Sequence, residues 1–180
     1  EVNSGGGMRS EVPKIHAVIR EAYSPNFRTV VWCASAISQA HHAFWLLPEW
    51  YIKQGGYLGT PGSVWPSGNF KPPTAEEMKA YVSGLESAGV EGGRDPVLTR
   101  AFFWEAPLSA RVGPTGKMVF SANDRGDMIV KPEGRALGFN AVDAVKFGIA
   151  RAVASTREEL LASMGVKKWV HAGADATQLL

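Results

Sequence analysis

The fold of this protein is decided by residues 28–40, which read RTVVWCASAISQA. Residues 28–34 form a β-branched and aromatic run without polar alternation. Such a run is typical of a strand that is buried on both faces, as strands of parallel sheets are. Small residues follow it, and Ser38 lies among them. The stretch therefore predicts a buried strand that turns at Ser38 into a short apolar helix ending near Leu47.

A glycine-rich segment lies close to the start of the chain. Residues 1–3 read as the end of a strand, and Ser4-Gly5-Gly6-Gly7 follows them. Consecutive glycines disfavour both helix and strand interiors, so the segment predicts a tight loop. An amphipathic helix is expected after it, because Val12, Ile15 and Val18 recur at helical spacing.

The rest of the chain alternates between helical and strand-like patterns. Further helices are expected at 74–87, 95–104, 140–148 and 155–164, and further strands at 49–53, 108–112, 117–122, 128–130, 136–139 and 149–154. Thr74 with Glu77, and Ser155 with Glu158, have the spacing of a capping box. The glycines of 55–62 predict a looping stretch. This alternation favours an α/β fold in one domain.

Composition excludes several classes of function. The chain has 180 residues, 45% of them hydrophobic and 20% charged, and its formal net charge is +2. This balance demands neither nucleic acid nor an acidic membrane surface as a partner, and the longest apolar runs are too short for a membrane span. The single Cys33 excludes an internal disulfide and a cysteine-rich zinc site, so we expect a buried thiol and no cofactor. The compartment is left open, with the cytoplasm favoured.

Two turns that follow consecutive strands carry the chemistry. The glycine loop around Gly6 bares backbone N–H groups at the start of a helix, which suits a developing oxyanion. Ser38 lies at a second strand-to-helix turn, where a serine projects its hydroxyl above the sheet. The N–H of Gln39, the next residue, is the second expected oxyanion donor.

Four blocks resemble a known superfamily. Residues 2–7 resemble the Ile-Asn-Ser-Pro-Gly-Gly loop of the Clp protease proteolytic subunit and of the signal-peptide-peptidase-A and NfeD-type serine peptidases. Residues 34–40 are similar to their Ala-Ala-Ser-Ala-Gly nucleophile turn, with Ser38 at the serine position. Residues 59–62 resemble the Gly-Ser-Ile-Gly turn of the signal peptide peptidases. Residues 139–165 resemble the closing segment of that group.

The resemblance implies a ClpP/crotonase-like spiral of ββα units over residues 1–165, lacking the N-terminal strands of that fold, and a C-terminal tail over 166–180. It implies a serine peptidase that hydrolyses peptide bonds of a peptide or protein substrate and assembles as a homo-oligomer. Its oxyanion hole comes from Gly6 and Gln39. The residues expected to line the substrate site are Gly5, Gly7, Gly59 and Trp65. Where the family has proline this chain has Gly5, and Gln39 replaces a small residue.

The base that would activate Ser38 is the open question of the sequence. The Clp subunit takes a histidine from just after the glycine turn, where this chain has no histidine. The resemblance to the NfeD type implies a Ser–Lys dyad instead, with Lys79 as the base and Lys71 as a second candidate. A catalytic lysine must be neutral, which requires burial. The alternative for Lys79 is an ordinary solvated helix lysine.

Three further interpretations stay open. His41 and His42 follow Ser38 at helical spacing, and we expect one in the core and one exposed to solvent. The absent histidine and the altered residues after Ser38 also fit a catalytically inactive ClpP-like scaffold or assembly module. A crotonase-type acyl-CoA enzyme ranks third, because no acidic residue is suitably placed in the glycine turn region.

Overall fold

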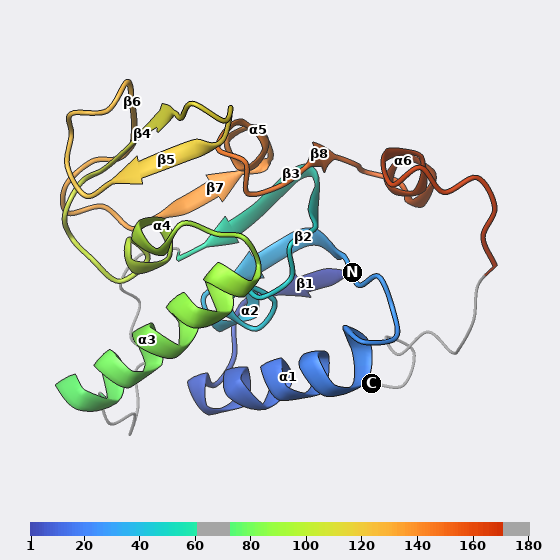
Figure 1. Cartoon of the computed structure of the whole chain (residues 1–180), viewed down its shortest axis with the longest axis horizontal. Coiled ribbons are helices and arrows are strands. Elements are labelled where there is room, and N and C mark those ends of the chain that lie inside the picture. The colour runs from blue at the N-terminus through green and yellow to red at the C-terminus, as the bar shows by residue number, and fades with distance from the viewer. Residues whose placement is uncertain (61–72, 171–180) are drawn as a thin grey trace.

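The computed structural model describes residues 1–60 and 73–170, and it shows a mixed α/β protein (Figure 1). Its main sheet has five strands, in the order β1-β2-β3-β7, with β8 also paired to β3. The strands are β1 (Val2–Ser4), β2 (Val31–Ile37), β3 (Trp50–Gly59), β7 (Gly138–Asn140) and β8 (Ala152–Val153). The alternation seen in the sequence therefore gives the expected layered α/β architecture.

Parallel pairing brings the carboxyl ends of the first three strands to one edge of the sheet. β1 pairs with β2 so that Ser4 lies opposite Ala36, and β2 pairs with β3 so that Ile37 lies opposite Gly59. The three strands thus end side by side. The turns that follow β1 and β2 must meet there, whatever sequence they carry.

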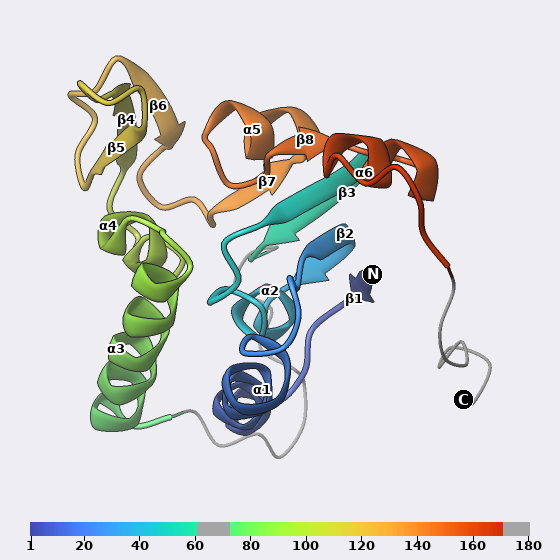
Figure 2. The same cartoon turned by 45° about the vertical axis from the view of Figure 1, so that its right-hand side comes forward.

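The helices cover both faces of this sheet (Figure 2). α1 (Val12–Val18) and α2 (Gln39–His42) lie on one face, and α6 (Arg157–Ser163) lies on the other, where Leu160 packs against Tyr51. The remaining helices are α3 (Ala75–Glu91), α4 (Pro96–Arg100) and α5 (Ala141–Lys146), with a 3-10 turn η1 (Arg9–Glu11) before α1 and a π turn η2 (Ile19–Tyr23) after it. None of the helices within the described residues is long and apolar enough to span a membrane.

The strand expected over 49–53 continues to Gly59. The prediction of a looping stretch over 55–62 is therefore wrong for residues 55–59. The glycines form a bulge inside β3, because Cys33 pairs with Ile52 while Ser35 pairs with Tyr57. A Cβ at Gly56 would lie 2.8 Å from Ile52 Cγ1. The glycines therefore mark a close approach of two backbones instead of an exposed loop.

Several helix ends differ from expectation. The helix expected over 95–104 ends at Arg100, and the helix after Ser38 ends at His42 instead of near Leu47. α3 runs through Gly89 to Glu91, because Gly89 packs so closely on Trp45 that a Cβ there would lie 2.9 Å from the indole nitrogen. α6 is capped by Thr156 and Glu159, one residue later than the predicted box of Ser155 and Glu158. The Ser155 hydroxyl instead accepts a hydrogen bond from the Gln54 N–H. The box of Thr74 and Glu77 forms as predicted.

A small antiparallel sheet lies beside the main one, in the order β5-β4-β6. Its strands are β4 (Leu108–Val112), β5 (Met118–Ser121) and β6 (Met128–Lys131). The buried Lys131 ammonium donates to the carbonyls of Ala101 and Trp104 just beyond α4. Asp95, which caps the start of α4, also accepts from the Phe120 N–H at 3.2 Å. These two contacts fix the small sheet to α4.

Arg94 joins three segments inside the core. Its guanidinium donates to the carbonyls of Ile149 at 2.9 Å, Gly148 at 3.4 Å and Leu47 at 3.4 Å. The guanidinium carbon also lies 5.0 Å from the centre of the Trp45 ring. Burial lowers the pKa of Arg94 to about 10, which still leaves it charged at neutral pH. One cation therefore holds the segments before β3 and before β8 next to α3.

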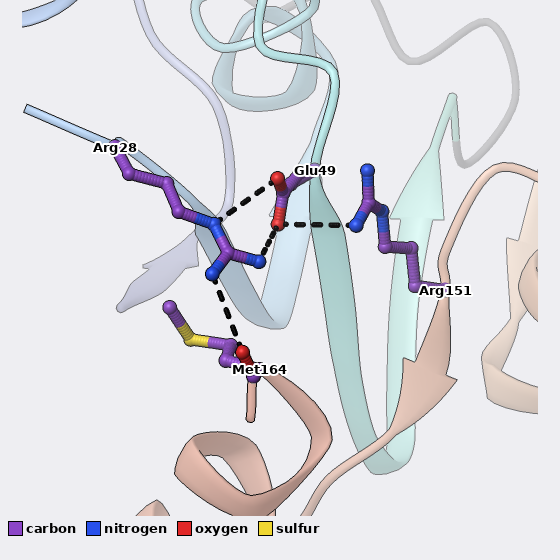
Figure 3. Close-up of polar contacts among 4 residues, drawn as sticks. All are labelled: Arg28, Glu49, Arg151 and Met164. Carbon is purple, nitrogen blue, oxygen red and sulfur yellow. Dashed lines mark hydrogen bonds and ion pairs between the residues drawn. The ribbon is translucent and has the colours of Figure 1, made fainter. Parts of the chain in front are cut away.

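The carboxylate of Glu49 links the segments that lead into β2, β3 and β8, at the end of the sheet opposite Ser38 (Figure 3). Glu49 precedes β3 and accepts from Arg28, which precedes β2, at 2.8 Å, and it lies 3.4 Å from Arg151, which precedes β8. Arg28 also donates to the carbonyl of Met164 at the end of α6. The hydrogen bond from Arg28 is the main cause that lowers the pKa of Glu49.

We expect Arg94→Lys to lower the free energy of unfolding by about 2–4 kcal/mol, because a lysine cannot reach all three carbonyls and leaves buried acceptors without donors. Chemical denaturation measures this loss. Arg20→Lys is the matched control, since Arg20 is exposed and pairs only with Glu91. Equal stability of the two variants would contradict the structural role of Arg94.

We expect Glu49→Gln to lower the free energy of unfolding at pH 7 by about 1–2 kcal/mol, because a neutral amide loses the charge-assisted bond from Arg28. A carboxyl with a lowered folded pKa stabilises the protein above its unfolded value of 4.5, and that contribution disappears as the pH falls through the folded pKa. The stabilities of the two proteins should therefore approach each other as the pH falls from 4.5 and converge below the folded pKa of Glu49. A difference that persists there would contradict the assignment.

Candidate active site

Ser38 forms a strained turn between β2 and α2. Its backbone angles are φ 52° and ψ −127°, and it is the one non-glycine residue with a positive φ within the described ranges. Such a conformation costs of order 1–3 kcal/mol and persists only where the surroundings impose it. Here the Ser38 N–H donates to the Gly59 carbonyl at 2.8 Å, and its own carbonyl accepts from the His41 N–H at 3.2 Å. The strand end and the helix start thus fix the elbow predicted from the sequence.

The glycine loop lies against this elbow. Gly6 has a φ of 131°, and a Cβ built there would lie 3.5 Å from Ser38 Cβ. The Gly6 N–H takes no part in sheet pairing and donates instead to the Ser4 hydroxyl at a long 3.3 Å. A Cβ built at Gly5 or at Gly7 would meet no atom of the described residues within 4 Å.

Gln39 borders Ser38 on the other side. It is the first residue of α2, so its backbone N–H has no acceptor inside the helix. Its side-chain oxygen accepts a hydrogen bond from the Ser38 hydroxyl. Its side chain also interacts with the Tyr81 hydroxyl, which opposes the rise that burial causes in the Tyr81 pKa. Gly6 and Gln39, the two residues expected to supply oxyanion donors, therefore both lie next to Ser38.

Lys79 does not join Ser38 within one chain. It is an exposed residue of α3, and no hydrogen bond links it to Ser38. Tyr81 is the residue of α3 that faces Gln39 and His42. Since a helix turns by about 100° per residue, Lys79 points to nearly the opposite side. The solvated alternative for Lys79 therefore fits this structure better than the catalytic one.

The other expected site residues have mixed positions. Gly59 contributes to the elbow through its carbonyl, and a Cβ there would lie 2.6 Å from Leu137 O, so its role in this structure is close packing with β7. Lys71 and Trp65 lie outside the described residues. Cys33 is buried, and burial raises the pKa of its thiol to about 12, which agrees with the expected inert thiol.

Both histidines after Ser38 are buried, so the expectation that one is exposed is wrong. The exposed fraction is 0% for His41 and 3% for His42, because α2 is covered by aromatic side chains from the α4 region. His41 lies 4.4 Å from the Phe102 ring, and neither of its ring nitrogens has a hydrogen-bond partner. His42 Nδ1 lies 2.8 Å from the Tyr81 hydroxyl, and the His42 carbonyl bonds the His16 ring.

Burial keeps these imidazoles neutral. Desolvation lowers the pKa of His41 well below its usual value and that of His42 to about 3. They cannot hold a proton taken from Ser38 near neutral pH. Within the parts of the chain that the structure describes, no group of three or more potential metal-binding side chains occurs.

Tyr81 is the site residue that sequence reasoning missed. It lies in the segment from which Lys79 was chosen, and it is one of four tyrosines. The signal was present, because Met78, Tyr81 and Leu85 recur at helical spacing, and Leu85 is buried. That spacing indicates the inward face of the helix.

Comparison of this chain with known protein families, with curated proteins and with solved structures finds no match.

We expect His41→Phe to keep or raise the free energy of unfolding at pH 7, by up to about 1 kcal/mol, because phenylalanine has a similar shape and removes unpaired buried nitrogens. A histidine with a lowered folded pKa stabilises the protein above its unfolded value of 6.5, and this stability is lost as the pH falls below that value. Between pH 6 and 4, the free energy of unfolding should therefore fall less steeply in the variant than in wild type, by about 1.4 kcal/mol per pH unit. Denaturation at several pH values measures this slope.

His16→Phe provides the control. The His16 ring bonds the His42 carbonyl at 2.9 Å, so its loss should destabilise the protein at pH 7. Equal losses from the two substitutions would show that His41 also has a polar partner.

Proposed function

We propose that this protein is a serine peptidase of the ClpP/crotonase type, with Ser38 as the nucleophile. The observation that carries the proposal is the backbone of Ser38, which adopts a conformation that L-residues avoid and thereby directs its side chain out of the strand end. A serine retained only for packing needs no such conformation. The contact between the Gly6 loop and the Ser38 side chain supports the same assignment.

In this proposal Ser38 Oγ attacks the carbonyl carbon of a peptide bond, and the carbonyl oxygen becomes an oxyanion. The N–H groups of Gly6 and Gln39 donate to that oxyanion. The weak bond from Gly6 to Ser4 makes this donor easy to redirect. The Ser38 proton passes to a base and then to the leaving amine, and water hydrolyses the acyl-enzyme.

The base is a lysine in this proposal. Gln39, the hydrogen-bond acceptor of Ser38, is an amide and cannot hold the proton at neutral pH. The resemblance gives two lysines as candidates within one chain: Lys79, which points away from Tyr81 and its neighbours, and Lys71, which lies outside the described residues. The lysine of a second copy is the other source, which agrees with the proposed homo-oligomer. Consecutive parallel strands ending at one edge support the proposed ββα spiral.

An inactive scaffold of the same fold is the second candidate. One observation favours it: among the described residues, no lysine and no carboxylate bonds the Ser38 hydroxyl. In that case the elbow and the glycine loop would be retained for assembly alone.

We expect a fluorophosphonate probe to label Ser38 covalently, with mass spectrometry to locate the adduct. Ser38→Ala should abolish labelling. Lys71→Ala should slow it at least about 100-fold, as loss of a general base does, and Lys79→Ala should leave it near the wild-type rate. Folded wild-type protein that is not labelled at Ser38 would sink the peptidase proposal and favour the scaffold. Slow labelling of Lys79→Ala would show that Lys79 is the general base.

A further inference from the structure

A chain of polar contacts runs from Ser38 into the protein. The Ser38 hydroxyl donates to the Gln39 side-chain oxygen. The Gln39 side chain also interacts with the Tyr81 hydroxyl, and this interaction opposes the rise that burial causes in the Tyr81 pKa. The Tyr81 hydroxyl lies 2.8 Å from His42 Nδ1. These groups come from the β2–α2 turn, from α3 and from the end of α2. This series of polar contacts therefore links the elbow to α3, a helix that lies more than thirty residues further along the sequence.

The contacts allow one consistent direction of donation. Burial keeps His42 neutral, with its pKa lowered to about 3, so one ring nitrogen accepts while the other carries the proton. Burial also raises the pKa of Tyr81, so its hydroxyl keeps a proton. In the tautomer of His42 with an unprotonated Nδ1, the Tyr81 hydroxyl donates to that nitrogen at 2.8 Å, and its oxygen is left to accept from the Gln39 amide.

Packing fixes Tyr81 more firmly than it fixes Gln39. The Tyr81 ring lies 6.1 Å from the Phe103 ring and 5.7 Å from the His42 ring. The Arg9 guanidinium lies 5.8 Å from the centre of the same ring. By contrast, Gln39 is a flexible side chain at the start of a helix of four residues. Ordering a glutamine costs rotamer entropy, which a fixed partner must offset.

We propose that Tyr81 is a positioning residue for Ser38, acting through Gln39. Its hydroxyl, held by His42, keeps the Gln39 side chain beside the elbow, and Gln39 in turn fixes the orientation of the Ser38 hydroxyl. Tyr81 contacts no reacting atom. This inference rests on the proposed serine chemistry, and it gives the inward face of α3 a positioning role, whereas the sequence had suggested Lys79 of the same helix as the base.

The test is a double-mutant cycle of Ser38 labelling by a fluorophosphonate. The rate of covalent labelling at saturation and the probe concentration at half-saturation are measured for wild type, Tyr81→Phe, Gln39→Ala and the double variant. Tyr81→Phe keeps the ring packing and removes the hydroxyl alone. We expect the saturating rate to fall about 10-fold in each single variant, with little change in half-saturation. Because Tyr81 acts through Gln39, Tyr81→Phe should cause no further loss in the Gln39→Ala background.

Tyr51→Phe is the matched control. Tyr51 is buried at the other end of β3, opposite Trp32, so removing its hydroxyl should leave the labelling rate unchanged. Thermal unfolding of every variant identifies loss of the fold.

Three outcomes overturn the inference and remain distinguishable. Folded Tyr81→Phe that labels at the wild-type rate removes Tyr81 from the site and leaves the serine proposal standing. Independent, multiplicative losses in the double variant show that Tyr81 does not act through Gln39. Wild-type protein without any labelling at Ser38 overturns the proposed function itself, and the positioning role falls with it.

Discussion

The parallel pairing of β1, β2 and β3 is the constraint on which the site depends. Parallel strands all end at the same edge, so the glycine loop after Ser4 and the elbow after Ile37 are brought together by the sheet alone. The Ser38 N–H donates a hydrogen bond to the Gly59 carbonyl, which fixes the elbow to the end of β3. The strained backbone of Ser38 is sustained by this pairing and not by any local preference of serine.

Buried cations that bond to carbonyl groups hold the surrounding elements in place. Arg94 connects the segments that enter β3 and β8, and Lys131 holds the small sheet to the end of α4. Neither is hydrogen-bonded to a carboxylate, so each relies on carbonyl dipoles, and Arg94 also relies on the Trp45 ring. At the same end of the main sheet, Glu49 bridges two arginines in a partly solvated position. Interior carbonyl contacts and a surface ion pair thus both stabilise the segments that enter β3 and β8.

Within the described residues, the surroundings of Ser38 are unreactive. The Ser38 hydroxyl bonds an amide, and the two histidines that follow it in the sequence are neutral and buried. None of these groups removes a proton from Ser38 at neutral pH. In the proposed peptidase, orientation of the hydroxyl and removal of its proton are therefore assigned to different groups.

The sequence by itself determined the α/β class, the strand that leads to Ser38, the glycine loop and the cap at Thr74, because these depend on local propensity and short-range hydrogen bonds. Only the tertiary structure decided that β3 continues through its glycines, that His41 and His42 are both buried, and that Tyr81 rather than Lys79 lies on the side of α3 that faces His42. Each of these depends on contacts between distant segments: Gly56 against Cys33, His41 against Phe102, and Tyr81 against His42. Residue spacing gives the angle around a helix, but only packing decides which side of that helix faces the core.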